Sequence, residues 1–129
     1  MKGPRCFRAD ERGSASVELV VLMPLLLLIL FSSVQGAVYY HASTLAMAAA
    51  QEGARAASRE NGTLATGTSA ASAFVTDAAG DSLTAVTIRG SRTAAIATIT
   101  VTGSSLSLVP GWTPTVEQSA SLPVERITR

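Results

Sequence analysis

The feature that most constrains this chain is an uncharged stretch of 22 residues, LVVLMPLLLLILFSSVQGAVYY at positions 19–40. As a helix that rises about 1.5 Å per residue, this stretch is roughly 33 Å long, enough to cross the ~30 Å hydrocarbon layer of a bilayer. The rest of the 129 residues is dominated by Ala, Ser, Thr and Gly. So few large apolar side chains cannot cover the stretch inside a soluble core. The sequence therefore predicts a membrane-spanning helix rather than a buried one.

The charges on either side of this stretch predict its orientation. Before Gly13 there are four basic and two acidic residues, a net charge of +2, and after it six basic and seven acidic residues, a net charge of −1. Because basic flanks stay on the cytoplasmic side, we expect a single-pass cell-membrane protein with a cytoplasmic N-terminus and an extracytoplasmic C-terminus. Tyr39 and Tyr40 suit the far interface. No element gathers the basic stripe that nucleic-acid binding needs, so we expect no nucleic-acid partner.

A single acid, Glu18, stands at the edge of the apolar stretch, five positions after Gly13. An unpaired charge at the centre of a membrane helix costs about 2.5–3.5 kcal/mol, whereas the positive N-terminal end of a helix favours a carboxylate. One interpretation of Glu18 is a solvated interfacial glutamate that has no partner.

The segment GSASVELVVLMPLLLLILF, followed by two tyrosines and the Ala-rich AMAAAQEGARAAS, resembles the TadE-type minor pilins of tight-adherence systems. Its Gly13 and Glu18 spacing is similar to the prepilin-peptidase motif of type IV pilins and pseudopilins. Leu19 replaces the aromatic residue that is more usual in the family. The resemblance implies cleavage between Gly13 and Ser14, where glycine lets an extended backbone approach a protease cleft closely. Such a cut would give Ser14 a new ammonium group, a natural partner for Glu18, and the resemblance implies that this contact is made with a neighbouring subunit during assembly. The implied partners are a prepilin peptidase, other pilin or pseudopilin subunits, a membrane assembly platform and the lipid bilayer.

Pro24 lies inside the expected span and removes one helical hydrogen bond, which leaves the Val20 carbonyl without its usual donor. We therefore expect a kink or local loosening at Pro24, either tolerated in a pilin-like assembly or without any role.

The whole chain is predicted to be an α+β protein whose long N-terminal membrane helix continues as a stalk. The expected parts are a cleaved basic leader (1–13), a transmembrane helix (14–40), an Ala-rich stalk helix (41–62) that Asn61 and Gly62 end, and a small extracytoplasmic α+β domain (63–129). In this domain we expect a short helix near 68–79 and an antiparallel sheet of about three strands, at 82–89, 95–103 and 116–124.

Several details of this domain follow from the pattern. Residues 90–92 are predicted to be the hairpin turn, and Pro123 makes the last strand an edge strand. Alternation places Ala97, Ile99 and Val101 on one face. A domain of 67 residues is small for a self-sufficient core, so the hairpin should pack on the Ala-rich helix. Trp112 is expected in the core or as an interface plug, and the alternative is an exposed contact residue.

The sequence offers no constellation for catalysis. It holds one His and one Cys, and Asp77 and Asp81 flank a glycine in a way that fits a turn. We therefore expect a protein without a cofactor that is not an enzyme. Two other hypotheses remain: a single-pass membrane protein whose exported domain is a binding module unrelated to pili, and a small secreted β-rich domain released by signal peptidase beyond residue 36.

Overall fold

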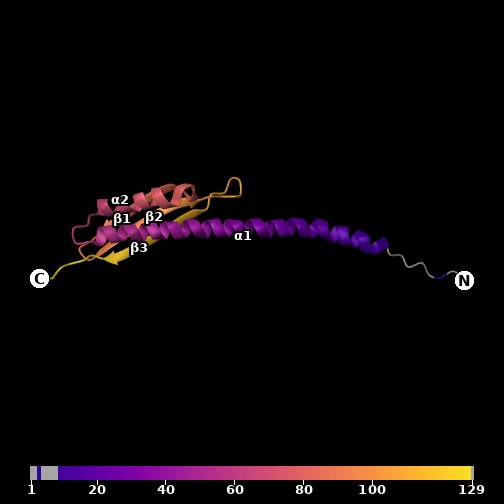
Figure 1. The fold of residues 1–129 in the computed structure, drawn as a ribbon, viewed down its shortest axis with the longest axis horizontal. Helices are drawn as coiled ribbons and strands as arrows, with labels where there is room; N and C mark the ends of the chain where they lie inside the picture. Colours follow the sequence, from indigo (N-terminus) through magenta and orange to yellow (C-terminus); the bar gives the residue numbers. More distant parts are fainter. Residues whose placement is uncertain (1–2, 4–8, 129) are drawn as a thin grey trace. The chain divides into compact units, whose positions relative to one another are not determined.

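The computed structural model describes Gly3 and residues 9–128. Two helices come first, α1 (Ala9–Ser58) and α2 (Leu64–Phe74) (Figure 1). A π-helical turn (Val75–Ala79) and a 3-10 turn (Gly80–Ser82) lead into three strands, β1 (Leu83–Arg92), β2 (Ile96–Ser105) and β3 (Thr115–Pro123). The predicted α+β class, with one long N-terminal helix and a three-stranded antiparallel sheet, is confirmed. The chain divides into two units, Met1–Val34 and Gln35–Arg129, and α1 runs through the division.

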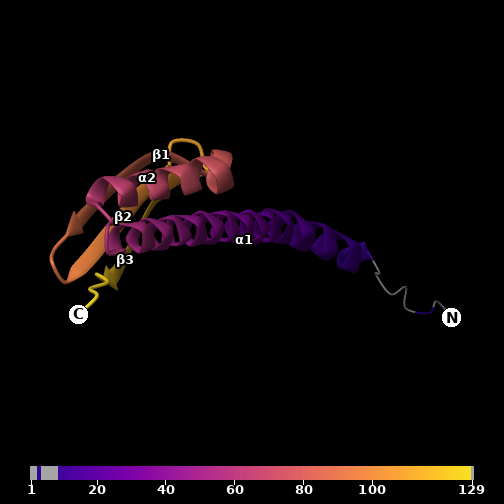
Figure 2. The ribbon, with the colours of Figure 1, turned by 60° about the vertical axis from the view of Figure 1, so that its left-hand side comes forward.

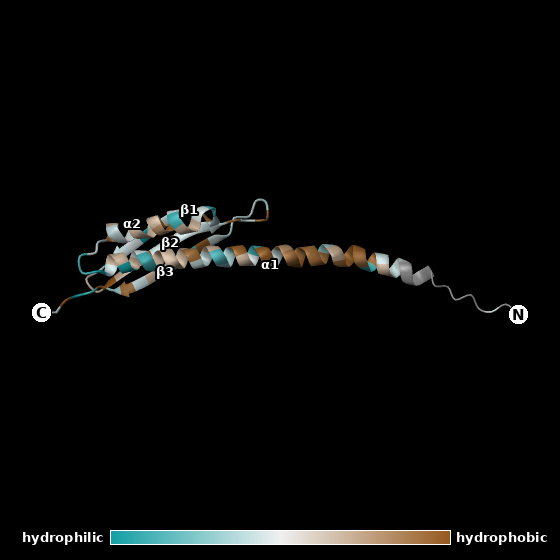
Figure 3. Cartoon of the chain, in the orientation of Figure 1, coloured by the Kyte–Doolittle hydropathy of each residue, from teal (hydrophilic) through white to brown (hydrophobic). Residues whose placement is uncertain are grey.

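In the first unit, α1 exposes large apolar side chains on every side between Val17 and Val34. Figure 3 shows this part of the helix mostly in the brown of hydrophobic residues. The helix continues through Pro24 without ending, and the kink at this residue stays a prediction. The hydroxyls of Ser32 and Ser33 donate to the carbonyls of the residues four positions earlier, at 2.7 and 2.8 Å. These two polar groups are thus satisfied within the helix, which makes them compatible with an apolar environment.

In the second unit, the sheet has the order β1-β2-β3 with both pairs antiparallel, so β3 is an edge strand as predicted. Ala97, Ile99 and Val101 of β2 are fully buried, as the alternation indicated. They pack against the part of α1 within this unit and against α2, which cover one face of the sheet (Figure 2). The other face carries hydroxyl side chains. Two pairs of them, Thr98 with Ser121 and Thr100 with Ser119, are hydrogen-bonded across the strands at 2.8 and 3.0 Å.

The core is built from small residues brought very close together. Six alanines on α1 are fully buried: Ala42, Ala46, Ala49, Ala50, Ala54 and Ala57. At Gly53, an added Cβ atom would lie 2.8 Å from the Gly67 carbonyl oxygen of α2 and 2.9 Å from the Ala71 Cβ. The two helices therefore approach backbone to backbone, and this contact depends on glycine. The predicted packing of the hairpin on the Ala-rich helix is confirmed.

Two local predictions were wrong, the position of the hairpin turn and the start of the second helix. Residues 90–92 are not a turn, since they extend β1 and pair with residues 97–99. The turn lies instead at 93–95, where the Thr93 hydroxyl accepts from the Ala95 and Ile96 amides and the Thr93 amide donates to the Ile96 carbonyl at 2.8 Å. The second helix begins at Leu64 rather than near 68, because Thr63 and Thr66 form a capping box.

Two further differences concern the end of the long helix and the position of Trp112. The long helix ends at Ser58, four residues before the predicted end at Gly62. Trp112, predicted to be in the core, is 52% exposed because it sits on the loop between β2 and β3 rather than on a strand.

The close contact of α1 and α2 can be tested by replacing Gly53 with Ala, with Gly36→Ala as the matched control. Both glycines lie in α1, so both variants gain about 1 kcal/mol of helix propensity. A Cβ at Gly36 meets nothing within 4 Å, whereas one at Gly53 pushes α2 and Ile99 away. We expect Gly53→Ala to lower the free energy of unfolding by about 1–3 kcal/mol and Gly36→Ala to leave it equal or higher. The measurement is thermal unfolding in detergent. Equal midpoints for the two variants would contradict the glycine-dependent contact.

Candidate functional site

All the residues that the sequence singled out for function lie on α1 within the first unit. Gly13, Ser14 and Glu18 occupy its early turns and are exposed, and Pro24 follows in the apolar part. Residues 1–2 and 4–8 of the expected leader, with Cys6 among them, lie outside the described residues. The expected cleavage point is thus inside a helix here. A protease that needs extended backbone must unwind this turn.

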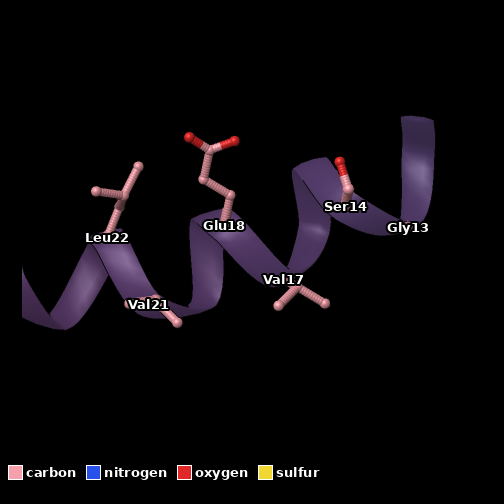
Figure 4. A pocket seen from close by; sticks show the side chains of 6 residues that line it. All are labelled: Gly13, Ser14, Val17, Glu18, Val21 and Leu22. Carbon is pink, nitrogen blue, oxygen red and sulfur yellow. The ribbon is translucent and has the colours of Figure 1, made fainter. Parts of the chain in front are cut away.

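Glu18 lies one helical turn after Ser14. In Figure 4, the Ser14, Glu18 and Leu22 side chains point to one side of the helix, whereas Val17 and Val21 point to the other. Together with Gly13, these residues border an open surface rather than an enclosed cavity. Such a surface offers no enclosed pocket for a small-molecule substrate. It suits contact with lipid or with another helix.

The Glu18 carboxylate takes part in none of the hydrogen bonds or ion pairs found among the described side chains. The ion pair found there joins Arg55 and Glu52, 3.9 Å apart and exposed to solvent. A pair of this kind contributes little to stability. Glu18 differs because apolar side chains follow it directly, so its charge needs a partner wherever the helix leaves water.

The helix around Glu18 has the properties of a membrane span. Among the described residues, one helix, Gly13–Ser58, is long and apolar enough to cross a bilayer, with a mean hydropathy of 2.5 over its most apolar window. None of that window is buried inside the protein. A core helix of a soluble domain would be mostly covered. The most apolar part of this helix therefore has no protein cover.

The described residues contain no cluster of three or more His, Cys, Asp or Glu side chains that fits a metal ion. Asp77 and Asp81 lie in the two short helical turns between α2 and β1, and the Gly80 between them has a φ of +48°. A left-handed backbone at this position explains the glycine, and the two acids belong to the turn.

Comparison with known families identifies the segment that holds these residues. Residues 13–55 match the model described as TadE-like protein. This segment is similar to the TadE-like family. The match begins at Gly13 and ends three residues before the end of α1, so it covers about a third of the chain and leaves out α2 and the sheet. Comparisons with curated proteins and with solved structures gave no match.

Sequence reasoning missed one contact of this protein, at the start of the second unit. Gln35 is 8% exposed, and its side-chain amide binds the loop between β2 and β3. Its Nε2 group donates to the Leu106 carbonyl at 3.2 Å, and its Oε1 accepts from the Leu108 amide at 2.8 Å. The only signal in the sequence is a glutamine shortly after the apolar run, behind Ser32 and Ser33, and it does not say what the residue binds.

Proposed function

We propose that this TadE-like chain is a non-enzymatic minor pilin, processed by a prepilin peptidase, that takes part in assembling a surface pilus or a related secretion system. The match of residues 13–55 to the TadE-like family suggests a role related to Tad pilus assembly. The observation that carries the finer proposal is the exposed Glu18 at the start of an uncovered apolar helix, one turn after the expected new N-terminus.

Anchoring in the membrane is the first step of the proposed function. The uncovered apolar side chains of residues 17–34 extend over about 27 Å of helix, close to the thickness of the hydrocarbon layer. The basic leader keeps the N-terminus in the cytoplasm, and the second unit lies outside. The cell membrane is thus the proposed location before incorporation into a pilus.

Cleavage is the second step. A prepilin peptidase cuts between Gly13 and Ser14, and the Ser14 amine becomes a positive charge at the start of the helix. Nothing lies within 4 Å of the position that a Cβ atom at Gly13 would take. The fold itself therefore does not require a glycine here, which supports a requirement imposed by the protease.

Assembly is the third step. In the hydrocarbon layer a bare carboxylate is unfavourable, and the ammonium of an adjacent processed subunit neutralises it. The Glu18 side chain projects outward from α1, so it is available to a neighbouring helix (Figure 4). Pairing with the amine of a neighbour fixes how far one subunit is displaced along the next. The other proposed partners are the assembly platform and the peptidase.

Amino-terminal sequencing of the protein extracted from membranes tests the processing step. We expect the mature chain to begin at Ser14. A chain that keeps residues 1–13 would instead support a membrane-anchored binding module unrelated to pili. A start beyond residue 36 would indicate release by signal peptidase.

Replacing Glu18 by Ala tests the assembly step. We expect the variant to enter the membrane and fold normally but to be missing from sheared surface fibres, since the charge that pairs with the neighbour is gone. Glu52→Ala is the matched control, because it removes an exposed acid from the same helix outside the apolar segment. Glu18→Ala protein in fibres at the wild-type level would refute the role of Glu18.

A further inference from the structure

The loop between β2 and β3 exposes apolar side chains that neither the fold nor the proposed assembly step uses. Leu106, Leu108, Val109 and Trp112 are each 43–53% exposed, and we call these four residues the apolar loop patch. No charged residue occurs between Arg92 and Glu117. Several large apolar side chains grouped on one short loop are unfavourable in water, and such groups mark contact surfaces.

Part of the loop backbone is paired in local hydrogen bonds. The Trp112 amide donates to the Val109 carbonyl at 3.3 Å, and Gly111 between them has a φ of +80° after Pro110, as in a type II turn. Ser107 accepts from the Val109 amide through its hydroxyl at 3.1 Å and donates back to the Val109 carbonyl at 2.9 Å. A loop with its polar groups paired in this way can leave bulk water at a lower cost than an open one.

The loop is attached at the end of the second unit where the apolar helix enters it. Gln35 binds the loop through two hydrogen bonds, to Leu106 and Leu108, and it follows Val34 directly in the chain. Tyr39, one turn further along α1, donates from its hydroxyl to the Thr115 carbonyl at 3.4 Å. The apolar loop patch is therefore held beside the residue at which the uncovered apolar helix ends.

We propose that the apolar loop patch is a second membrane contact, which inserts into the boundary between lipid headgroups and acyl chains on the extracytoplasmic side. This inference rests on the proposed membrane anchoring of α1. Residues 35–40 cover about 9 Å of helix, comparable to the ~6 Å thickness of one headgroup layer. Trp and Tyr are the residues that favour this layer, and Trp112 and Tyr39 both lie at this end of the unit.

A loop contact beside the helix holds the second unit against the membrane at two places. A single helix would let the unit swing, whereas two attachments limit its tilt and fix which side of the sheet faces outward. Because TadE-like assembly needs neighbouring subunits to meet, this orientation would present the same surface of every copy.

Trp112 is the only tryptophan of the chain, so its fluorescence reports on the patch without a label. The full chain is reconstituted in phosphatidylcholine vesicles, with or without bromine atoms on the acyl chains near the headgroups. We expect brominated lipid to quench Trp112 strongly, and aqueous iodide to quench it severalfold less in vesicles than after the chain is unfolded in denaturant. Resistance to alkaline carbonate is measured on the same vesicles.

Two variants sharpen the test. Val109→Asp places a charge in the patch, and Ile127→Asp is the matched control on an exposed apolar residue outside it. We expect Val109→Asp to shift the Trp112 emission to longer wavelength and reduce quenching by brominated lipid severalfold, and Ile127→Asp to match the wild type.

The outcomes separate the patch from the anchor. Trp112 that is open to iodide and insensitive to brominated lipid, in a chain that resists carbonate, overturns the patch and leaves the anchor intact. Trp112 shielded from both quenchers, more so at high protein density, overturns the lipid contact in favour of a second copy of the chain. Extraction by carbonate refutes the membrane anchor and the patch together.

Discussion

The structure depends on one constraint, the absence of any protein cover over the apolar side chains of residues 17–34. A hydrocarbon layer removes the free-energy cost of exposing these side chains to water. In the same layer, any polar group on the helix that has no hydrogen-bond partner is unfavourable. Ser32 and Ser33 meet this condition with bonds to the helix itself. Glu18 has no such bond among the described residues, and we propose that its partner is the amine of a neighbouring subunit. The proposed anchor and the proposed pairing of Glu18 therefore both rest on this apolar surface.

The second unit folds around a core that contains few large side chains. Ile99, Val101 and Val116 are its largest fully buried residues. The buried alanines and the contact of Gly53 with Gly67 let the helices approach closely, so that dispersion contacts are dense although each side chain is small. Packing this close leaves no room for an added methyl group at the helix contact. It also leaves the larger apolar residues, Trp112 among them, free to lie on the surface.

The sequence predicts what depends on local pattern. The apolar and Ala-rich runs predicted α1, the alternation of Ala97, Ile99 and Val101 predicted the buried face of β2, and the Gly13 and Glu18 spacing led to the family. Prediction from the sequence failed where contacts between residues far apart in the chain determine the local structure. Residues 90–92 look like a turn until the pairing with β2 extends the strand through them, and the partners of Gln35 lie 71 and 73 positions away. Cleavage and the partner of Glu18 stay predictions, because a second molecule takes part in each.

The pairing of Glu18 with a Ser14 amine is tested most directly by zero-length cross-linking in intact membranes, using an apolar carbodiimide that joins a carboxylate to an amine in contact with it. Mass spectrometry should then find Glu18 joined by an amide bond to the N-terminal residue of a second processed subunit, and find no such peptide for Glu18→Gln. Chains that still carry residues 1–13, with a Glu18 that forms no cross-link to any amine, would contradict the pairing and with it the pilin function.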